Sequence, residues 1–370
     1  MIFEVLNKLL PAGMQQGVSD YSEFTLEELT AMSIWQRIAI RNWSLEIVTV
    51  SFIFSFIAIY KLGDLYNQSK ATTFLKGISP VLKKHFYQVG VTGDKLYVKD
   101  SAENFSSYAT GRTNIAKVDI KISLQPRQNL FVWILEYVLG FFTGSVKIPT
   151  DKAEITITPS VQYDNFIVAI VSKLGMNDAR KFNYFLSLCK TNDSTNLPES
   201  FVYMSEANEF QDKFSIPELN KALTLQSASF VKFIAATDQP VERPESLREM
   251  IPQRRLVVSV DISNKKDDLA LVQQVLEALF VFVDRIADKS ITFRPEALKK
   301  VVKTREVEIE KLKKIQEEIQ QEKVAEEKAQ QKRAERDRLR NLSREEQIKL
   351  EKKEMEKKQK KLQRKQKVRM

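Results

Sequence analysis

A dense run of basic side chains ends the chain, where the last 19 residues contain ten basic and two acidic residues. On a helix this density places positive charge on nearly every face, which favours a polyanionic partner. Binding to phosphates would release counterions and be sensitive to salt. The run has no aromatic residue for base stacking, which favours the backbone or shape of structured RNA. The candidate RNA-binding residues are Lys352, Lys353, Lys357, Lys358, Lys360, Lys361, Arg364, Lys365, Lys367 and Arg369.

Two other interpretations of this basic run stay open from composition alone. It could be a solvated tail, or it could adsorb to anionic lipid. The segment 299–370 holds 26 basic and 15 acidic residues, whereas residues 1–298 hold 32 and 33. The formal net charge of +10 is therefore a property of the tail.

Side chains that could support catalysis or bind a metal are sparse. The single His85 and single Cys189 cannot build a structural zinc site, which needs about four N or S ligands, or a disulfide framework. The pair Gly111-Arg112 stands alone, without the further glycines of a phosphate-binding loop. We expect His85 to be a packing or surface residue and Cys189 to be a buried thiol. The sequence predicts no enzyme, cofactor or metal site.

An apolar segment at 45–65 is predicted to be a transmembrane helix. Leu45 to Leu62 would form about 27 Å of helix, close to the thickness of a hydrocarbon core. Trp43 and Tyr60 near its two ends are typical of interfacial aromatic residues. A buried core helix is the alternative. The predicted span residues are Leu45, Ile47, Val48, Phe52, Ile53, Phe54, Phe56, Ile57, Ile59 and Tyr60.

A second apolar segment runs from Asn129 to Phe142, with Glu136 at its centre. The cost of inserting this glutamate offsets the gain from the apolar residues. At helical period the polar positions form one narrow strip, which predicts a helix in a protein core or in the membrane interface, with a second span as the alternative. The candidate interface residues are Phe131, Trp133, Ile134, Tyr137 and Phe141.

Residues 1–44 are predicted to be a short segment before the span. Glu4 and Lys8 interrupt any signal-peptide core, so we expect no cleavage. Thr25 to Arg41 is predicted to form an amphipathic helix, with Thr25 and Glu28 at the spacing of a capping box. The five acidic residues of the segment lack the spacing of a calcium loop.

Residues 66–298 are predicted to form one α+β domain, because strand and helix patterns are mixed along them. A run from Val161 to Leu174 is ambiguous. Strands are predicted at 95–100, near Tyr108, and at 115–124, 146–149, 153–159, 228–236 and 255–263. Helices are predicted at Asp178–Cys189, Ile216–Leu225 and Asp267–Asp288.

The tail at 299–370 is predicted to be helical, since it contains no Gly or Pro and many good helix formers. Leu312, Ile315 and Ile319 begin a heptad-like stripe that then loses register, so self-pairing as a coiled coil is weakly supported. Ser343 and Glu346 form a second capping box, which predicts a break near Asn341 and a helical pair or arm.

The order of these features resembles the calumin family, which are coiled-coil-domain-containing endoplasmic-reticulum membrane proteins and subunits of the PAT complex. No single motif carries the resemblance, which spans roughly residues 45–370. The matching segments are the span, Thr110-Gly111-Arg112, LPESFVYMSE at Leu197–Glu206, RRLVVSVDI at Arg254–Ile262, the helix at Leu276–Lys300 and the basic C-terminus.

The resemblance implies an endoplasmic-reticulum protein with a luminal N-terminus, one span, and a cytosolic domain and tail. It implies docking on ribosomal RNA at the tunnel exit. It also implies translocon partners, including a small membrane protein, and nascent multipass membrane proteins as clients. Animal members have a long acidic luminal region to which calcium binding is ascribed; this chain lacks it, so calcium binding is not carried over. The alternative function is a membrane tether or scaffold whose basic tail binds anionic lipid and whose domain binds protein partners.

Overall fold

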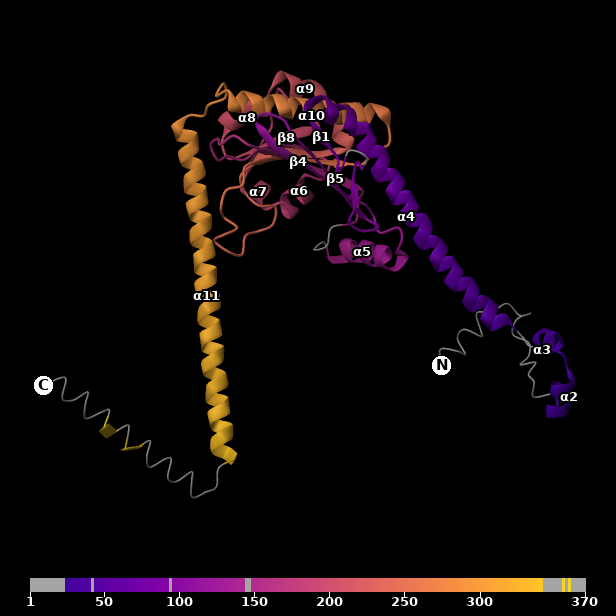
Figure 1. Cartoon of the computed structure of the whole chain (residues 1–370). Helices are drawn as coiled ribbons and strands as arrows, with labels where there is room; N and C mark the ends of the chain where they lie inside the picture. The colour runs from indigo at the N-terminus through magenta and orange to yellow at the C-terminus, as the bar shows by residue number, and fades with distance from the viewer. Residues whose placement is uncertain are drawn as a thin grey trace. The chain divides into compact units, whose positions relative to one another are not determined.

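A computed structural model describes residues 24–40, 43–92, 95–143, 148–341, 355–356 and 359–360 (Figure 1). The chain divides into two compact units. The first unit holds the chain up to Val241 together with Pro252–Leu298. The second unit holds Glu242–Ile251 together with the chain from Lys299 onward.

The first unit is built on an antiparallel sheet with ten strands in the described part of the chain. The strand order is β1-β3-β4-β5-β10-β9-β6-β8-β7, and β2 also pairs with β3. This arrangement confirms the predicted α+β class. The strands are β1 (Gln88–Val89), β2 (Val98–Lys99), β3 (Asn104–Thr110), β4 (Ile115–Ser123), β5 (Lys152–Pro159), β6 (Val168–Ser172), β7 (Lys190–Asn192), β8 (Phe201–Ser205), β9 (Val231–Thr237) and β10 (Arg255–Asp261).

Helices cover both faces of this sheet (Figure 1). On one face lie α8 (Asn208–Phe214), α9 (Pro217–Ala222) and α10 (Lys266–Ala287), with α10 packed against α4 and α9. On the other face lie α5 (Leu130–Thr143), α6 (Met176–Phe182) and α7 (Tyr184–Ser187). A short 3-10 helix, Ser227–Ser229, precedes β9. In β4 the core residues Val118, Ile120 and Ile122 lie at alternate positions and are buried, whereas every residue of β6 is buried.

Helix α4 (Ser44–His85) is a single helix of 42 residues, so the predicted span continues directly into the folded domain. Its second half is buried through Ala71, Phe74, Ile78 and Leu82. At Gly77 the helix approaches α10 so closely that a Cβ atom would lie 2.6 Å from Leu269 Cδ1. A rigid helical connection therefore joins the apolar segment to the domain core.

The helix predicted at Thr25–Arg41 is broken into α2 (Leu26–Ala31) and α3 (Ile34–Ile40). The capping box of Thr25 and Glu28 is confirmed, with both reciprocal hydrogen bonds present. The prediction of a single helix is wrong, because Ser33 and Gln36 form a second pair of reciprocal hydrogen bonds between side chain and backbone. This second capping box starts a new helix within the predicted one.

Several other local predictions also differ from the structure. The helix predicted at Asp178–Cys189 is two short helices joined at Asn183, and that at Ile216–Leu225 shortens to α9. No strand forms at Ile148–Pro149, while Val146 and Lys147 lie outside the described residues. Strand β8 has no alternating pattern because all five of its residues are buried.

In the second unit, the segment Glu242–Ile251 accompanies the part of α11 (Pro295–Asn341) that begins at Lys299. Gln316 Nε2 donates a hydrogen bond to the Glu245 carbonyl oxygen at 2.9 Å. Leu312 is buried, whereas Ile315 and Ile319 are exposed, so the heptad-like stripe does not continue as a buried seam. Helix α11 reaches Asn341, but Ser343 and Glu346 lie outside the described residues. The second helix of the tail therefore stays a prediction.

Candidate functional site

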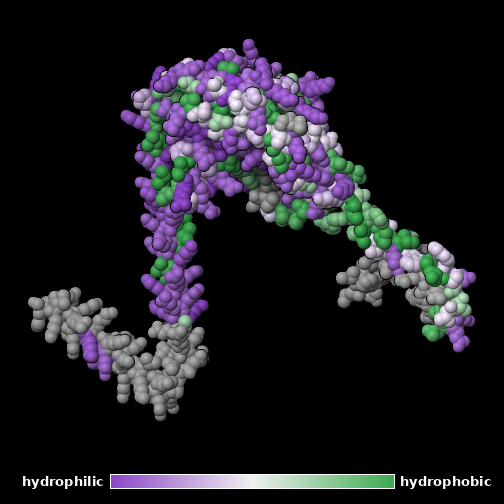
Figure 2. Space-filling model, viewed as in Figure 1, coloured by the Kyte–Doolittle hydropathy of each residue, from purple (hydrophilic) through white to green (hydrophobic). Residues whose placement is uncertain are grey.

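The first half of α4 exposes apolar side chains in every direction around the helix. Phe52, Ile53 and Phe54 are consecutive, so they point about 100° apart, and all three are exposed. From Glu46 onward, α4 is the one helix in the described residues that is long and apolar enough to cross a membrane, and only 6% of its most apolar window is buried. Figure 2 shows this hydrophobic surface along α4. A soluble core helix would bury such residues, so these features fit the predicted span.

The predicted span residues share this exposure with few exceptions. Val48 is half-buried, and the side chain of Leu45 lies outside the described side chains. The exposed residues are Ile47, Phe52, Ile53, Phe54, Phe56, Ile57, Ile59 and Tyr60.

A polar cluster lies one to two helical turns after the apolar segment. We call it the Asp151 cluster, and it consists of Asn67, Lys70, Gln125, Arg127 and Asp151. Arg127 Nη1 donates to Asp151 Oδ1 at 2.8 Å and Arg127 Nη2 donates to Asp151 Oδ2 at 2.7 Å. Lys70 pairs with the same carboxylate. The fully buried Asn67 accepts from Arg127 Nη1 at 3.0 Å and donates to the Gln125 carbonyl oxygen at 3.0 Å.

The electrostatics of this cluster favour the ionised carboxylate. Burial alone would raise the pKa of Asp151. Hydrogen bonds from Arg127, Lys70 and the Gln125 backbone N–H outweigh burial and lower the pKa of Asp151 from 3.8 to about 2. Removing one partner from such a group would leave an uncompensated charge, so the loss of any one of these side chains is expected to destabilise the domain.

The Asp151 cluster joins α4 to the segments on both sides of α5. Arg127 precedes α5 and Asp151 follows it, while Asn67 and Lys70 belong to α4. At Gly63 a Cβ atom would lie 2.6 Å from the Gln128 backbone nitrogen, so α4 contacts the start of the α5 connection directly. The cluster therefore holds both ends of this connection beside the point where α4 leaves the domain.

Helix α5 is apolar and exposed, and Gly140 is its one buried residue. The alternative of burial in a protein core is therefore wrong. A second span is also wrong, because β4 and β5 pair at Ser123 and Lys152, so the connection leaves and returns at one point of the sheet. Fourteen helical residues extend about 21 Å, which is short of the roughly 30 Å of a hydrocarbon core. The predicted interface residues Phe131, Trp133, Ile134, Tyr137 and Phe141 are all exposed, and Phe131 and Phe141 reach 71% and 72%.

The predicted RNA-binding residues of the tail lie almost entirely outside the described residues. Lys360 is the one of the ten that falls within them, and it is helical and exposed. The structure therefore brings none of these residues together with another, and their role stays a prediction.

The Gly111-Arg112 pair has a packing role. Gly111 adopts a φ of 93°, and a Cβ atom there would lie 2.7 Å from Tyr87 Cβ. Arg112 Nη2 donates to Asp284 Oδ2 of α10 at 2.6 Å, and its guanidinium also contacts the His85 ring. Burial and the nearby Arg112 cation lower the pKa of His85. These contacts tie the β3–β4 turn to α4 and α10, as expected for a packing histidine.

The remaining candidate for chemistry, Cys189, is buried as predicted. Its thiol lies 3.5 Å from the Phe185 carbonyl oxygen. Within the described part of the chain, no three His, Cys, Asp or Glu side chains are grouped so that they could hold a metal ion.

The chain is similar to a described protein family and to two fungal membrane proteins. A family model described as PAT complex subunit CCDC47 matches residues 42–361. The UPF0674 endoplasmic reticulum membrane protein YNR021W of Saccharomyces cerevisiae is 28% identical over 334 residues, which cover 80% of this chain and 82% of that protein. The UPF0674 endoplasmic reticulum membrane protein C2G5.01 of Schizosaccharomyces pombe is 28% identical over 296 residues, 77% of this chain and 79% of that protein.

Proposed function

The chain belongs to the family of PAT complex subunit CCDC47, and from this premise we propose that it binds translating ribosomes and the translocon and assists the insertion of multipass membrane proteins. The observation that carries the proposal is the family match over residues 42–361, which includes the apolar half of α4, the sheet domain and most of the tail. The family description names a subunit of a complex, in agreement with a non-enzymatic role.

We place the protein in the endoplasmic-reticulum membrane, as a single-span protein with a luminal N-terminus and a cytosolic C-terminus. Both fungal relatives are described as endoplasmic reticulum membrane proteins. The exposed apolar residues of α4 support the span. The orientation follows from the basic tail, because ribosomes are cytosolic and the tail must reach them.

Helix α5 lies in the cytosolic membrane interface in this proposal. Its exposed aromatic residues would enter the boundary between headgroups and acyl chains, where Trp and Tyr are favoured. Because the Asp151 cluster holds both ends of the α5 connection beside α4, the domain would rest on the membrane through two apolar elements.

The tail binds ribosomal RNA through its lysine and arginine side chains, by phosphate contacts that are sensitive to salt. The second candidate function is a membrane tether or scaffold whose tail binds anionic lipid. The exposed α5 agrees with this candidate as well as with the first, because a domain attached to the membrane through α5 could bind protein partners without a ribosome.

Purification of the full chain in mild detergent, with identification of the co-purifying proteins, tests the proposal. Recovery of ribosomal proteins, translocon subunits and a small membrane-protein partner is the expected result. Recovery of the chain with neither ribosomal nor translocon proteins, together with flotation on anionic vesicles that RNA does not compete away, would support the tether instead.

A further inference from the structure

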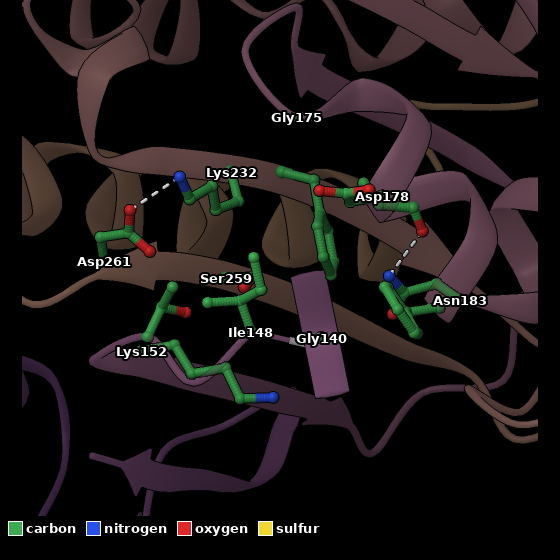
Figure 3. Close-up of a pocket in the computed structure, with 13 residues that line it drawn as sticks. Gly140, Ile148, Lys152, Gly175, Asp178, Asn183, Lys232, Ser259 and Asp261 are labelled. Atoms are coloured by element: carbon green, nitrogen blue, oxygen red, sulfur yellow. Dashed lines mark hydrogen bonds and ion pairs between the residues drawn. The ribbon is translucent and has the colours of Figure 1, made fainter. Parts of the chain in front are cut away.

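A cavity of about 330 Å³ lies between α5, α6 and the sheet, on the α5 face of the first unit. Its walls include Gly140 of α5, Lys152 of β5 and Asp178 of α6 (Figure 3). The volume falls within the range of small-molecule sites. The Asp151 cluster is next to it in sequence, since Lys152 follows Asp151 directly.

The charges in this cavity are balanced, but only half of them are paired. Lys232 Nζ forms an ion pair with Asp261 Oδ2 at 2.7 Å. Among the side chains that the structure describes, neither the Lys152 ammonium nor the Asp178 carboxylate has an ion-pair partner. These two groups come from different elements and lie on different walls of the cavity (Figure 3). One free cation and one free anion are complementary to a ligand that carries both charges.

The surroundings of the cavity are apolar and exposed. Helix α5 contributes one wall through Gly140, and most of its other residues have exposed apolar side chains. On the α6 side, Leu174 is 65% exposed and directly precedes the lining residue Gly175. Phe182 and Phe233 add apolar surface inside. A charged pocket flanked by exposed apolar residues fits a ligand with a polar head and an apolar body.

We propose that this cavity binds the headgroup of a zwitterionic phospholipid from the bilayer, with the phosphate at Lys152 and the amine or choline at Asp178. The acyl chains would then extend along α5 into the membrane. This inference rests on the proposed position of α5 in the membrane interface. A bound lipid would fix the height of the domain relative to the headgroups.

The test uses the full chain in vesicles of equal parts phosphatidylcholine and phosphatidylserine, each supplied in turn with a photoreactive diazirine close to the glycerol backbone, so that the label stays beside the headgroup. We expect wild-type protein to crosslink mainly to phosphatidylcholine, at peptides that contain 148–152 and 174–183. Asp178→Lys should shift the phosphatidylcholine-to-phosphatidylserine ratio toward phosphatidylserine by about tenfold, as expected for one lost charge-assisted contact. Asp164→Lys makes the same charge change at an exposed position outside the cavity and should keep the wild-type ratio.

Three further measurements distinguish failure of the lipid site from misfolding of a variant, from binding of a soluble headgroup and from failure of the proposed function. Lys152→Gln should reduce phosphatidylcholine labelling of the same peptides even if Asp178→Lys fails to fold. Soluble glycerophosphocholine should not compete, and competition would overturn the assignment to a bilayer lipid. An unchanged ratio in folded Asp178→Lys, or labels confined to α4 and α5, would also overturn it. Ribosome co-sedimentation of the same variants should be unchanged, so failure of the lipid site and failure of the proposed function are separately visible.

Discussion

Arg127 and Asp151 form a bidentate ion pair, with Nη1–Oδ1 at 2.8 Å and Nη2–Oδ2 at 2.7 Å. The two residues stand on either side of α5 in the sequence, and Lys70 of α4 meets the same carboxylate. The pair therefore fixes two exposed apolar helices to one point of the domain. In our account, this point lies at the cytosolic surface of the membrane.

Replacing the shared carboxylate should destabilise the domain. Asp151→Asn leaves Arg127 and Lys70 close together without their counter-charge, and the side chain of Asp151 is only 9% exposed. We expect a loss of about 2–3 kcal/mol in the free energy of unfolding, somewhat below the cost for a fully buried pair. Chemical denaturation of the full chain in detergent, monitored by circular dichroism, measures this loss. Asp193→Asn is the matched control, because Asp193 is highly exposed and its ion pair with Lys173 should contribute less than about 1 kcal/mol.

The contribution of Asp151 to the free energy of unfolding should depend on pH within a defined interval. Its folded-state pKa is about 2 against an ordinary value of 3.8, so the ionised form is favoured by folding. The stabilisation is therefore fully present above about pH 4 and is lost as the pH falls through the folded-state pKa. The difference in unfolding free energy between wild type and Asp151→Asn should shrink between pH 4 and pH 2. A difference that stays constant over this interval would contradict the ion-pair account.

Trp133 of α5 should report the depth of this helix in a membrane. In the variant Trp35→Phe with Trp43→Phe, Trp133 is the remaining tryptophan of the three in the chain. We expect its fluorescence to be quenched by lipids brominated close to the headgroup and less by lipids brominated near the chain end, as for an interfacial residue. Efficient quenching by aqueous iodide, without quenching by either lipid, would place α5 in water.

Glycosylation should reveal the orientation of the span. Asn67, Asn104, Asn192 and Asn341 each begin an Asn-X-Ser acceptor sequence after the span, whereas the acceptor sequence at Asn42 directly precedes the span. Glycosylation occurs in the lumen, so we expect no glycan at these four positions and a glycan at an acceptor sequence engineered into residues 1–23. A mobility shift that is removed by glycosidase and assigned to Asn104 or Asn192 would reverse the topology.

Elements of this fold that follow a local sequence period could be predicted, whereas contacts between residues far apart in the sequence could not. The apolar half of α4, the alternation in β4 and β5 and the amphipathic helix α10 were predictable, because each follows a local period. The Asp151 cluster was not, because Asn67, Arg127 and Asp151 are far apart in sequence and nothing local marks them as partners. Strand β8 was missed because a strand that is buried on both faces loses the alternation that identifies it. The capping pair of Ser33 and Gln36 was readable as S-x-x-Q and would have divided the N-terminal helix.

Ribosome co-sedimentation of the full chain, compared with a chain lacking residues 341–370, tests the central claim that the basic tail binds ribosomal RNA. At low salt the full chain should pellet with ribosomes, and high salt should release it, since phosphate binding weakens steeply with salt. The truncated chain should stay in the supernatant at low salt while its membrane integration is unchanged. Equal pelleting of both chains, with no response to salt, would contradict the account.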